Sequence, residues 1–242
     1  MDAALLSSIL YGSEGWLTAS LDNVNTQYLS CIKTLLGVRP STPNDLCLIE
    51  SGYLTLSGLI KDIQFKFFTK MMRQRADMND DPFMFVWELA KDARTPCARY
   101  VNKLLENENP VAAERDKLTQ RVEGSERTKP KLYKTSMNPE LDVHEVYSEK
   151  SNIPEYQRVA FTRLRLGSHN LMIERGRWSR IPTEDRKCVC GAVQTEQHVL
   201  GECPLSQDTR IASQIDSFHI PDLFAKDSKD VCKFCYDILK LY

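Results

Sequence analysis

The sequence predicts a mainly α-helical protein with a helical N-terminal part and a smaller helical C-terminal module. Apolar residues in the first half recur at spacings of three and four, as they do on one face of a helix. Proline and glycine stand where such helices are expected to begin and end. A group of cysteine and histidine residues at positions 188–203 marks the C-terminal module.

The N-terminal part, residues 1–122, begins with two short predicted helices. The stretch TQYLSCIKTLLG ends on Gly37, and the stretch STPNDLCLIESG has Pro43 near its start and Gly52 at its end. Proline is favoured in the first turn of a helix because its missing N–H needs no partner there, and glycine is favoured just after the last turn. We therefore expect one helix to stop at Gly37 and the next to run from Pro43 to Gly52.

A long amphipathic helix is predicted from residue 54 onward, in LTLSGLIKDIQFKFFTKMMRQR. Its apolar stripe contains Leu56, Leu59, Ile60, Ile63, Phe67 and Met71. The charged residues Lys61, Lys66 and Arg73 lie off that stripe, as an amphipathic helix requires. Two further helices are predicted over residues 81–93 and 109–122, since each stretch begins with a polar residue followed by proline.

The composition changes between residues 123 and 153. This stretch has few aliphatic residues, three lysines around Pro130 and a second proline at position 139. Such a composition predicts a linker or a long surface connection. Residues 154–242 then form the predicted C-terminal module, with a basic helix, the cysteine and histidine group, and a closing helix from about Ser228.

The composition of the chain excludes few classes of function. Hydrophobic residues make up 42% of the chain, enough for the core of one large or two modest domains, and the formal net charge is −1. A nearly neutral chain does not by itself indicate nucleic acid, a membrane or an acidic substrate. No apolar run is long enough to cross a membrane and no secretory leader is recognisable, so we expect an intracellular protein without a membrane partner, in the nucleus or the cytoplasm.

Residues Cys188, Cys190, His198 and Cys203 have the spacing C-x-C-x7-H-x4-C. In a reducing compartment, closely spaced cysteine and histidine residues are typical metal ligands rather than disulfide partners. Three thiolates and one imidazole complete a tetrahedral zinc site and leave no position for a substrate. The spacing therefore predicts a CCHC zinc knuckle that holds one structural zinc ion.

The remaining cysteines are expected to have no chemical role. Cys232 and Cys235 fall in a helical apolar pattern, so we interpret them as core thiols rather than as part of a second metal site with His219. Cys31, Cys47 and Cys97 each stand alone and are interpreted as packing residues.

A local excess of basic residues precedes the knuckle. Residues 151–190 contain eight arginines and lysines against four acidic residues. Guanidinium groups beside an aromatic side chain suit phosphates and unstacked bases, although a solvated arginine face with a core tryptophan has the same pattern. The candidate nucleic-acid contacts are Arg158, Arg163, Arg165, Arg175, Arg177, Trp178, Arg180, Arg186 and Lys187.

Several short motifs occur in a familiar order. The stretch RLRLGSH, then GRW, an arginine before C-x-C, the run QTEQH and finally CP resemble the C-terminal zinc-knuckle region of non-LTR (LINE-type) retrotransposon reverse transcriptases. The stretches ILYGSEGW and STPNDLCLIESG are similar to the region downstream of the polymerase palm in these elements. The resemblance covers about residues 5–72 and 158–204.

The resemblance implies a chain without the polymerase itself. A reverse transcriptase holds two Mg²⁺ ions on carboxylates that include an adjacent aspartate pair between apolar strands. The adjacent aspartates here, Asp80 and Asp81, lie in DMNDDPF, which lacks the aromatic residue and the strands. We therefore expect no enzymatic activity.

The predicted function is that of a noncatalytic, zinc-stabilised fragment of a mobile element that binds RNA or single-stranded DNA. In the parent family this region is thought to help hold template RNA and target DNA. Two alternatives stay open: a zinc-stapled module that binds a protein partner through its N-terminal helices, and an inactive retrotransposon remnant.

Overall fold

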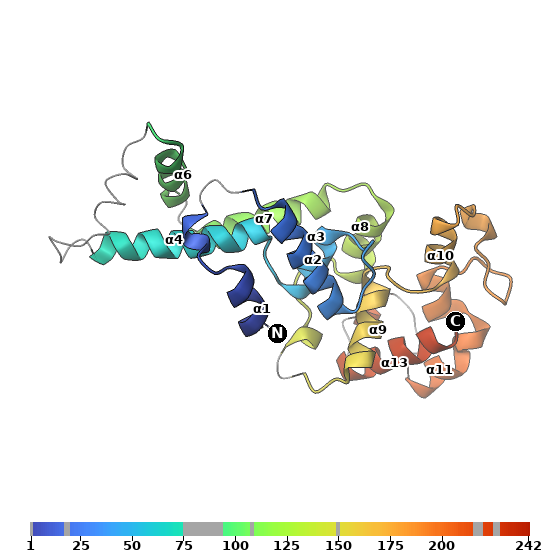
Figure 1. Cartoon of the computed structure of the whole chain (residues 1–242). Helices are drawn as coiled ribbons and strands as arrows, with labels where there is room; N and C mark the ends of the chain where they lie inside the picture. The colour runs from blue at the N-terminus through green and yellow to red at the C-terminus, as the bar shows by residue number, and fades with distance from the viewer. Residues whose placement is uncertain are drawn as a thin grey trace. The chain divides into compact units, whose positions relative to one another are not determined.

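The computed structural model describes residues 2–16, 20–74, 94–106, 109–148, 151–214, 220–224 and 228–242 (Figure 1). Over these residues the chain is mainly helical, as predicted. The described ranges contain no β-strand. Their β-type pairing is limited to an isolated antiparallel bridge between Lys187 and Val193. The helix expected over residues 81–93 lies outside the described residues.

The chain divides into two compact units that alternate along the sequence. Unit 1 consists of residues 1–29 and 54–118, and unit 2 consists of residues 30–53 and 119–242. The predicted division into residues 1–122, 123–153 and 154–242 follows the chain in order, whereas residues 30–53 belong to the same unit as the C-terminal half. Sequence alone gives no sign of this alternation because it arises from contacts between distant residues.

Unit 1 is built around the long helix predicted from residue 54. It contains α1 (Asp2–Ile9), the 3₁₀ turn η1 (Ser13–Gly15), the start of α2 (Asp22–Leu36), α4 (Leu56–Gln74), α6 (Pro96–Leu105) and most of α7 (Pro110–Glu123). Thr95 caps α6 by accepting a hydrogen bond from the backbone N–H of Ala98, and Asn109 caps α7 through Ala112. The helices predicted at residues 54–75 and 109–122 are thereby confirmed.

The core of unit 1 is apolar with one buried amide. Phe68, Val101 and Leu104 are buried together, and Phe65, Phe67, Met71, Tyr100 and Leu105 pack against them. Gln64 is fully buried beside this cluster, where its side-chain nitrogen donates to the carbonyl of Ser13 at 2.9 Å and its oxygen accepts from the hydroxyl of Tyr100 at 2.7 Å. Gln64 therefore links η1, α4 and α6.

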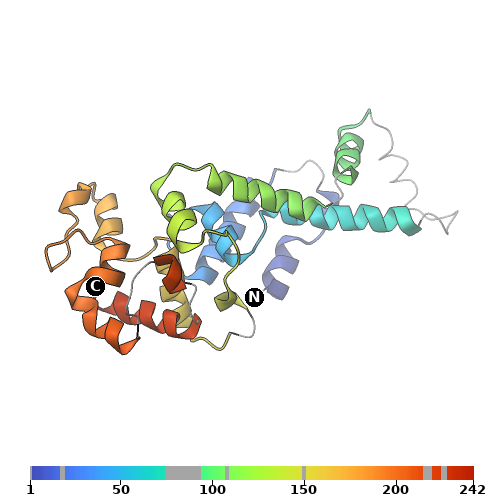
Figure 2. The same ribbon diagram turned by 180° about the vertical axis from the view of Figure 1, so that it is seen from behind.

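Unit 2 consists mostly of short elements. They are the end of α2, α3 (Asn44–Ser51), α8 (Thr128–Leu132), the π-helical turn η3 (Tyr133–Met137), η4 (Glu145–Tyr147), α9 (Glu155–Arg165), α10 (Met172–Trp178), η5 (Thr183–Asp185), η6 (His198–Glu202), η7 (Pro204–Ser206), α11 (Gln207–Ala212), α12 (Ile220–Phe224) and α13 (Ser228–Lys240). Helices α9 and α13 lie side by side in Figures 1 and 2 and pack extensively against each other. The helices predicted to stop at Gly37 and Gly52 are confirmed, and both glycines have positive φ.

The two cysteines of α13 lie in this core. Cys232 and Cys235 have no exposed surface. Burial raises the pKa of Cys232 to about 12 and that of Cys235 well above its ordinary value. Both thiols are therefore protonated packing residues, as the helical pattern predicted, and His219 lies outside the described residues.

Residues 123–153 differ from the expected linker because they supply part of the core of unit 2. Tyr133, Met137 and Val146 are each 1% exposed. A few large apolar side chains at wide intervals attach this segment to the core, although its average composition is polar and many of its other residues are exposed. The segment folds as α8, η3 and η4 rather than as a surface connection.

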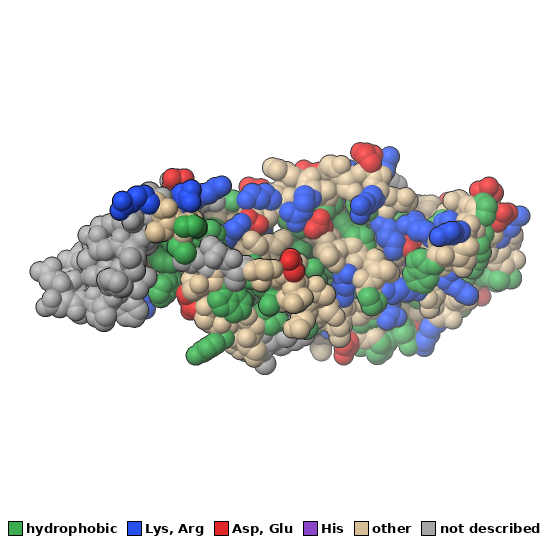
Figure 3. All heavy atoms as spheres, turned by 45° about the horizontal axis from the view of Figure 1, so that its top comes forward, with side chains coloured by type: hydrophobic (Ala, Val, Ile, Leu, Met, Phe, Trp, Pro, Cys, Tyr) green, Lys and Arg blue, Asp and Glu red, His purple; other side chains and the backbone are tan. Residues whose placement is uncertain are grey.

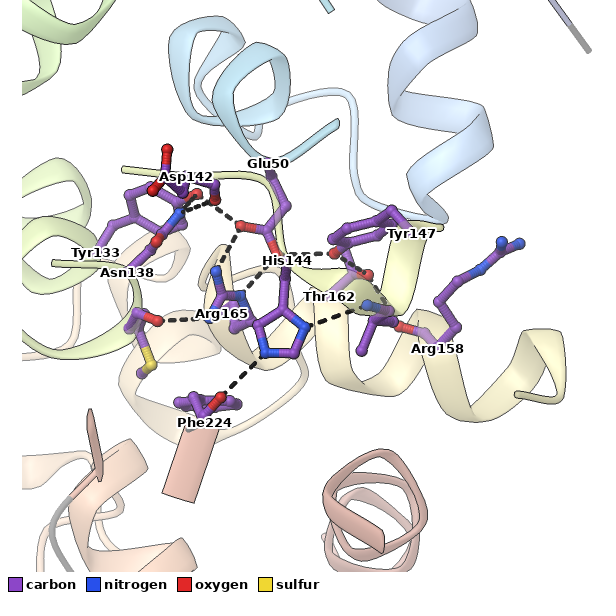
Figure 4. Close-up of polar contacts among 12 residues, drawn as sticks. Glu50, Tyr133, Asn138, Asp142, His144, Tyr147, Arg158, Thr162, Arg165 and Phe224 are labelled. Carbon is purple, nitrogen blue, oxygen red and sulfur yellow. Dashed lines mark hydrogen bonds and ion pairs between the residues drawn. The ribbon is translucent and has the colours of Figure 1, made fainter. Parts of the chain in front are cut away.

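A buried ion pair stands at the centre of unit 2 (Figure 4). The carboxylate of Glu50, from α3, accepts two hydrogen bonds from the guanidinium of Arg165, from α9, at 2.6 and 3.1 Å. The hydroxyls of Tyr133 and Tyr147 also donate to this carboxylate, at 2.6 and 2.7 Å. The side chains of Glu50 and Arg165 are 0% and 2% exposed.

Electrostatics keep this pair ionised. Burial alone would raise the pKa of Glu50, but the positive charge of Arg165 and the four hydrogen bonds hold that pKa below its ordinary value. Arg165 also donates to the carbonyl of Met137 at 2.5 Å. The prediction that Arg165 lies on a basic surface for nucleic acid is wrong, because its guanidinium is buried and its hydrogen bonds are made inside the protein.

Candidate metal centre

The predicted ligands Cys188, Cys190, His198 and Cys203 come together in unit 2. Their ligand atoms all lie within 4.8 Å of one another. The Sγ atoms of Cys188 and Cys203 are 3.7 Å apart, those of Cys190 and Cys203 are 3.8 Å apart, and Nε2 of His198 is 3.1 Å from Sγ of Cys190. Sulfur atoms at these distances form no disulfide, whose S–S bond is about 2.05 Å. The four side chains could hold one metal ion.

A tight loop presents the first two cysteines. The backbone N–H of Cys188 donates to the carbonyl of Ala192 at 2.7 Å, and the N–H of Gly191 donates back to Cys188 at 2.9 Å. Gly191 has φ of 94°, a conformation that a residue with a Cβ adopts rarely. Val189, between the cysteines, is 89% exposed, so the single intervening residue points away from the cluster on which both thiols converge, although Cys190 itself is exposed.

A short helical turn presents the other two ligands. Thr195 accepts a hydrogen bond from the N–H of His198 at 3.0 Å, and the N–H of Cys203 donates to the carbonyl of His198 at 2.7 Å across η6. Ser206 and Arg210 then bond to backbone carbonyls of Val199 and Cys203, at 2.6 and 3.0 Å. These two hydrogen bonds fix the C-terminal end of the turn that carries His198 and Cys203.

The thiols differ in electrostatic setting. Burial is the main reason that the pKa of Cys188 lies above its ordinary value. Burial also acts against ionisation of Cys203, yet hydrogen bonds from neighbouring groups, including the backbone of Leu205, hold its pKa below the ordinary value.

Ion pairs of a buried carboxylate hold α10, which precedes the loop with Cys188 and Cys190, in place. Glu174 of α10 is 1% exposed and forms ion pairs with Lys129 at 2.7 Å and with Arg177 at 3.2 Å. Gln194 accepts a hydrogen bond from the N–H of Met172, at the start of α10, at 2.5 Å. Helix α10 and the metal loop are therefore connected directly.

Arg186 links α10 to the loop that follows it. Its guanidinium donates to the carbonyls of Ile181 and Ile173, both at 2.9 Å. It packs so closely on Gly176 that a Cβ at position 176 would lie 2.6 Å from Cγ of Arg186. Arg186 was predicted to contact nucleic acid, but its donors already serve the backbone of its own unit.

The other residues that were predicted to contact nucleic acid differ in how exposed they are. Arg163, Arg175, Trp178, Arg180 and Lys187 are exposed, and Arg158 and Arg177 are half-buried. Figure 3 shows Lys and Arg side chains on the visible face of the end of unit 2 that carries α10. The structure therefore brings an aromatic side chain and several cations to the surface near the candidate metal centre.

Sequence reasoning missed Arg39 among these cations. The guanidinium carbon of Arg39 lies 4.0 Å from the ring centroid of Trp178, which is 50% exposed. Arg39 belongs to the connection between α2 and α3, where no local pattern marks it. Arg39 and Trp178 are more than a hundred positions apart in the sequence, so a local sequence pattern cannot reveal that they pair.

Four side chains are the number of ligands that a tetrahedral metal centre requires. None of the helices in the described ranges has both the length and the apolar character that crossing a membrane requires.

Comparison with protein-family models, with curated proteins and with solved structures finds no match to this chain.

Proposed function

We propose that this chain is a noncatalytic, zinc-stabilised protein that binds RNA or single-stranded DNA, and that it derives from the C-terminal region of a non-LTR retrotransposon reverse transcriptase. The observation that carries the proposal is the closed Cys/His centre beside an exposed surface of arginines and one tryptophan. The motifs around that centre, in their order along the chain, support the derivation.

The geometry of the ligands supports zinc. A regular tetrahedron with Zn–S bonds of about 2.3 Å has S–S edges of about 3.8 Å. The separations of 3.7 and 3.8 Å that involve Cys203 agree with this edge length. The separation of 3.1 Å between Cys190 and His198 is shorter than the corresponding S–N edge of about 3.5 Å. Three soft thiolates and one imidazole also favour zinc over magnesium or calcium, which prefer oxygen ligands.

The absence of catalysis is part of the proposal. A closed four-ligand centre leaves a zinc ion no water to activate, so its contribution is structural. Asp80 and Asp81, the adjacent aspartates of the chain, lie outside the described residues. Template-dependent nucleotide incorporation by the purified chain would contradict the proposal.

The proposed nucleic-acid surface consists of Arg175, Arg180, Lys187 and Trp178. The three cations are exposed and free to neutralise phosphates, and the half-exposed indole offers a face on which a base can stack. Arg165 and Arg186 are left out because their guanidinium groups bond inside unit 2.

Salt dependence of binding tests this proposal. Each phosphate neutralised on a single strand should contribute roughly 0.7 to the slope of log K against log[salt]. The double variant Arg175→Gln, Lys187→Gln should bind a single-stranded RNA more weakly and with a slope lower by about 1.4. Trp178→Leu should weaken binding with little change in slope, because stacking is not screened by salt.

Lys131→Gln serves as the matched control, since Lys131 is an exposed lysine of α8 in the same unit. Its affinity and slope should equal those of the unaltered chain. If the zinc-loaded protein binds neither RNA nor single-stranded DNA at low salt, the proposal fails and a zinc-stapled protein-interaction module takes its place.

A further inference from the structure

Unit 2 contains a cavity that the proposed nucleic-acid surface does not use. Its volume is about 280 Å³, and its lining includes Arg39, Arg163, Ser168, His169, Asn170 and Tyr242. These residues come from the connection before α3, from α9 and the loop after it, and from the residues that follow α13. None of them is a ligand of the candidate metal centre.

Two buried nitrogen atoms of the lining residues have no hydrogen-bond partner. They are one terminal nitrogen of the Arg39 guanidinium and Nδ1 of His169. The side chain of His169 has no exposed surface, and its Nε2 lies 3.1 Å from the carboxylate of Glu196. Buried polar atoms of native proteins almost always have a partner, so the unpartnered guanidinium nitrogen of Arg39, which can only donate, indicates a ligand with an acceptor atom.

Two arginines also bring positive charge to the cavity. Among the described residues, neither Arg39 nor Arg163 forms an ion pair. Burial lowers the pKa of Arg39, the negative charge of Glu174 opposes this shift, and the positive charge of Arg163 lowers the pKa by a smaller amount. Two arginines that repel each other at one cavity favour an anion that contacts both.

Both guanidinium groups are held in place before any ligand arrives. Arg39 stacks on Trp178 and donates to the side-chain oxygen of Asn170, and its backbone N–H donates to the hydroxyl of Ser168 at 2.9 Å. Arg163 donates from Nε to the carbonyl of Gly37 at 2.7 Å, which leaves its terminal nitrogens available. Preorganised arginines lose little side-chain entropy when they bind an anion.

We propose that this cavity binds one phosphate group and, resting on the proposed function, that the group belongs to a single-stranded nucleic acid. Arginine forks match the oxygen geometry of phosphate, and a dianion or diester can accept from Arg39 and Arg163 together. The cavity volume leaves space for part of the sugar that carries the phosphate. Trp178, stacked on Arg39, then lies beside the strand at this position.

Nuclear magnetic resonance of the four histidine side chains tests the phosphate site in titrations of the unaltered chain. The zinc-loaded chain is titrated with inorganic phosphate, with adenosine 5′-monophosphate and with a short single-stranded RNA, and the ring signals are assigned from His→Gln variants. The signals of His169 should shift to saturation with each probe, while those of His144 stay fixed. Acetate at equal ionic strength should leave His169 unchanged. An unmoved His169, or equal shifts at both residues, would overturn the site.

Substitutions of the two arginines then separate the site from the proposed function. Arg39→Gln and Arg163→Gln should each weaken phosphate binding by about tenfold, whereas Arg127→Gln, which removes an exposed arginine of the same unit, should have no effect. Since Arg39 also stacks on Trp178, Arg163→Gln provides the measurement if Arg39→Gln fails to fold.

The outcomes distinguish two failures. If phosphate binds through both arginines but RNA does not bind, the cavity is a phosphate site for a small molecule and the nucleic-acid source is wrong. If RNA binds equally well to both variants and phosphate does not bind, the cavity proposal is wrong while the proposed function stands.

Discussion

Unit 1 is built around one long helix, whereas the helices of unit 2 are mostly short and pack around an apolar core that also contains a buried ion pair. Helix α4 of unit 1 has 19 residues, while α10, α11 and α12 of unit 2 have seven, six and five. Helices of one or two turns are marginal without tertiary contacts. Unit 2 therefore depends on a few specific links, namely the ion pair of Glu50 and Arg165 and the Cys/His centre, so single changes should damage it more than unit 1.

Loss of the metal should have the largest effect and should fall on unit 2. Structural zinc contributes about 10–16 kcal/mol to the folding of zinc-finger peptides. The double variant Cys190→Ser, Cys203→Ser should lose the one equivalent of zinc expected for the purified chain, as measured by elemental analysis. Hydrogen exchange should then increase over residues 186–206 and stay unchanged in α4 and α6.

Cys97→Ser is the control for metal loss, since Cys97 is an exposed thiol of α6 in unit 1. It should keep both its zinc and the exchange pattern of the unaltered chain. Zinc content that survives the double substitution, or exchange that increases equally in both units, would contradict the assignment of the centre to unit 2.

Breaking the buried ion pair should have the next largest effect. Glu50→Gln leaves the guanidinium of Arg165 buried without its charge partner, which should lower the free energy of unfolding by about 3–5 kcal/mol. Urea unfolding followed by circular dichroism measures this change. Asp45→Asn, in the exposed pair of Asp45 with Arg121 at 3.1 Å, should cost less than about 1 kcal/mol. Equal losses in the two variants would show that burial does not decide the strength of the pair.

The polar link of unit 1 should be weaker than that of unit 2. Gln64→Leu removes the bonds to Ser13 and Tyr100 and should lower the free energy of unfolding by about 1–3 kcal/mol. Lys66→Ala, which removes only the exposed ion pair of Lys66 with Asp62, should change it by about 0.5 kcal/mol or less. Thermal unfolding of both variants measures the difference. A loss at Gln64 as large as that at Glu50 would remove the contrast between the units.

The features that could be predicted from the sequence are those whose signals are local. The long helix of unit 1 follows from apolar spacing within its own residues, and its neighbours follow from proline and glycine at their ends. The four ligands of the candidate metal centre lie within sixteen positions, so their spacing alone brings them together. The buried state of Cys232 and Cys235 follows in the same way from the apolar pattern of α13.

The features that were missed depend on residues far apart. Arg165 was placed on a basic face because its partner, Glu50, is 115 positions away. The cavity around Arg39 and His169 has no sequence signature, since the residues of its lining come from three separate stretches. Residues 123–153 resemble a linker in average composition, and only the fold reveals that Tyr133 and Met137 are core residues.

The contact between Gly176 and Arg186 has an evolutionary consequence. Any side chain at position 176 would collide with the aliphatic part of Arg186, while φ at Gly176 is not positive, so the neighbour rather than the backbone excludes larger residues. Natural selection then acts on the two positions as a pair. In descendants of this sequence, a larger residue should become established at position 176 only where position 186 has already changed to a shorter one, so the order of substitution is constrained.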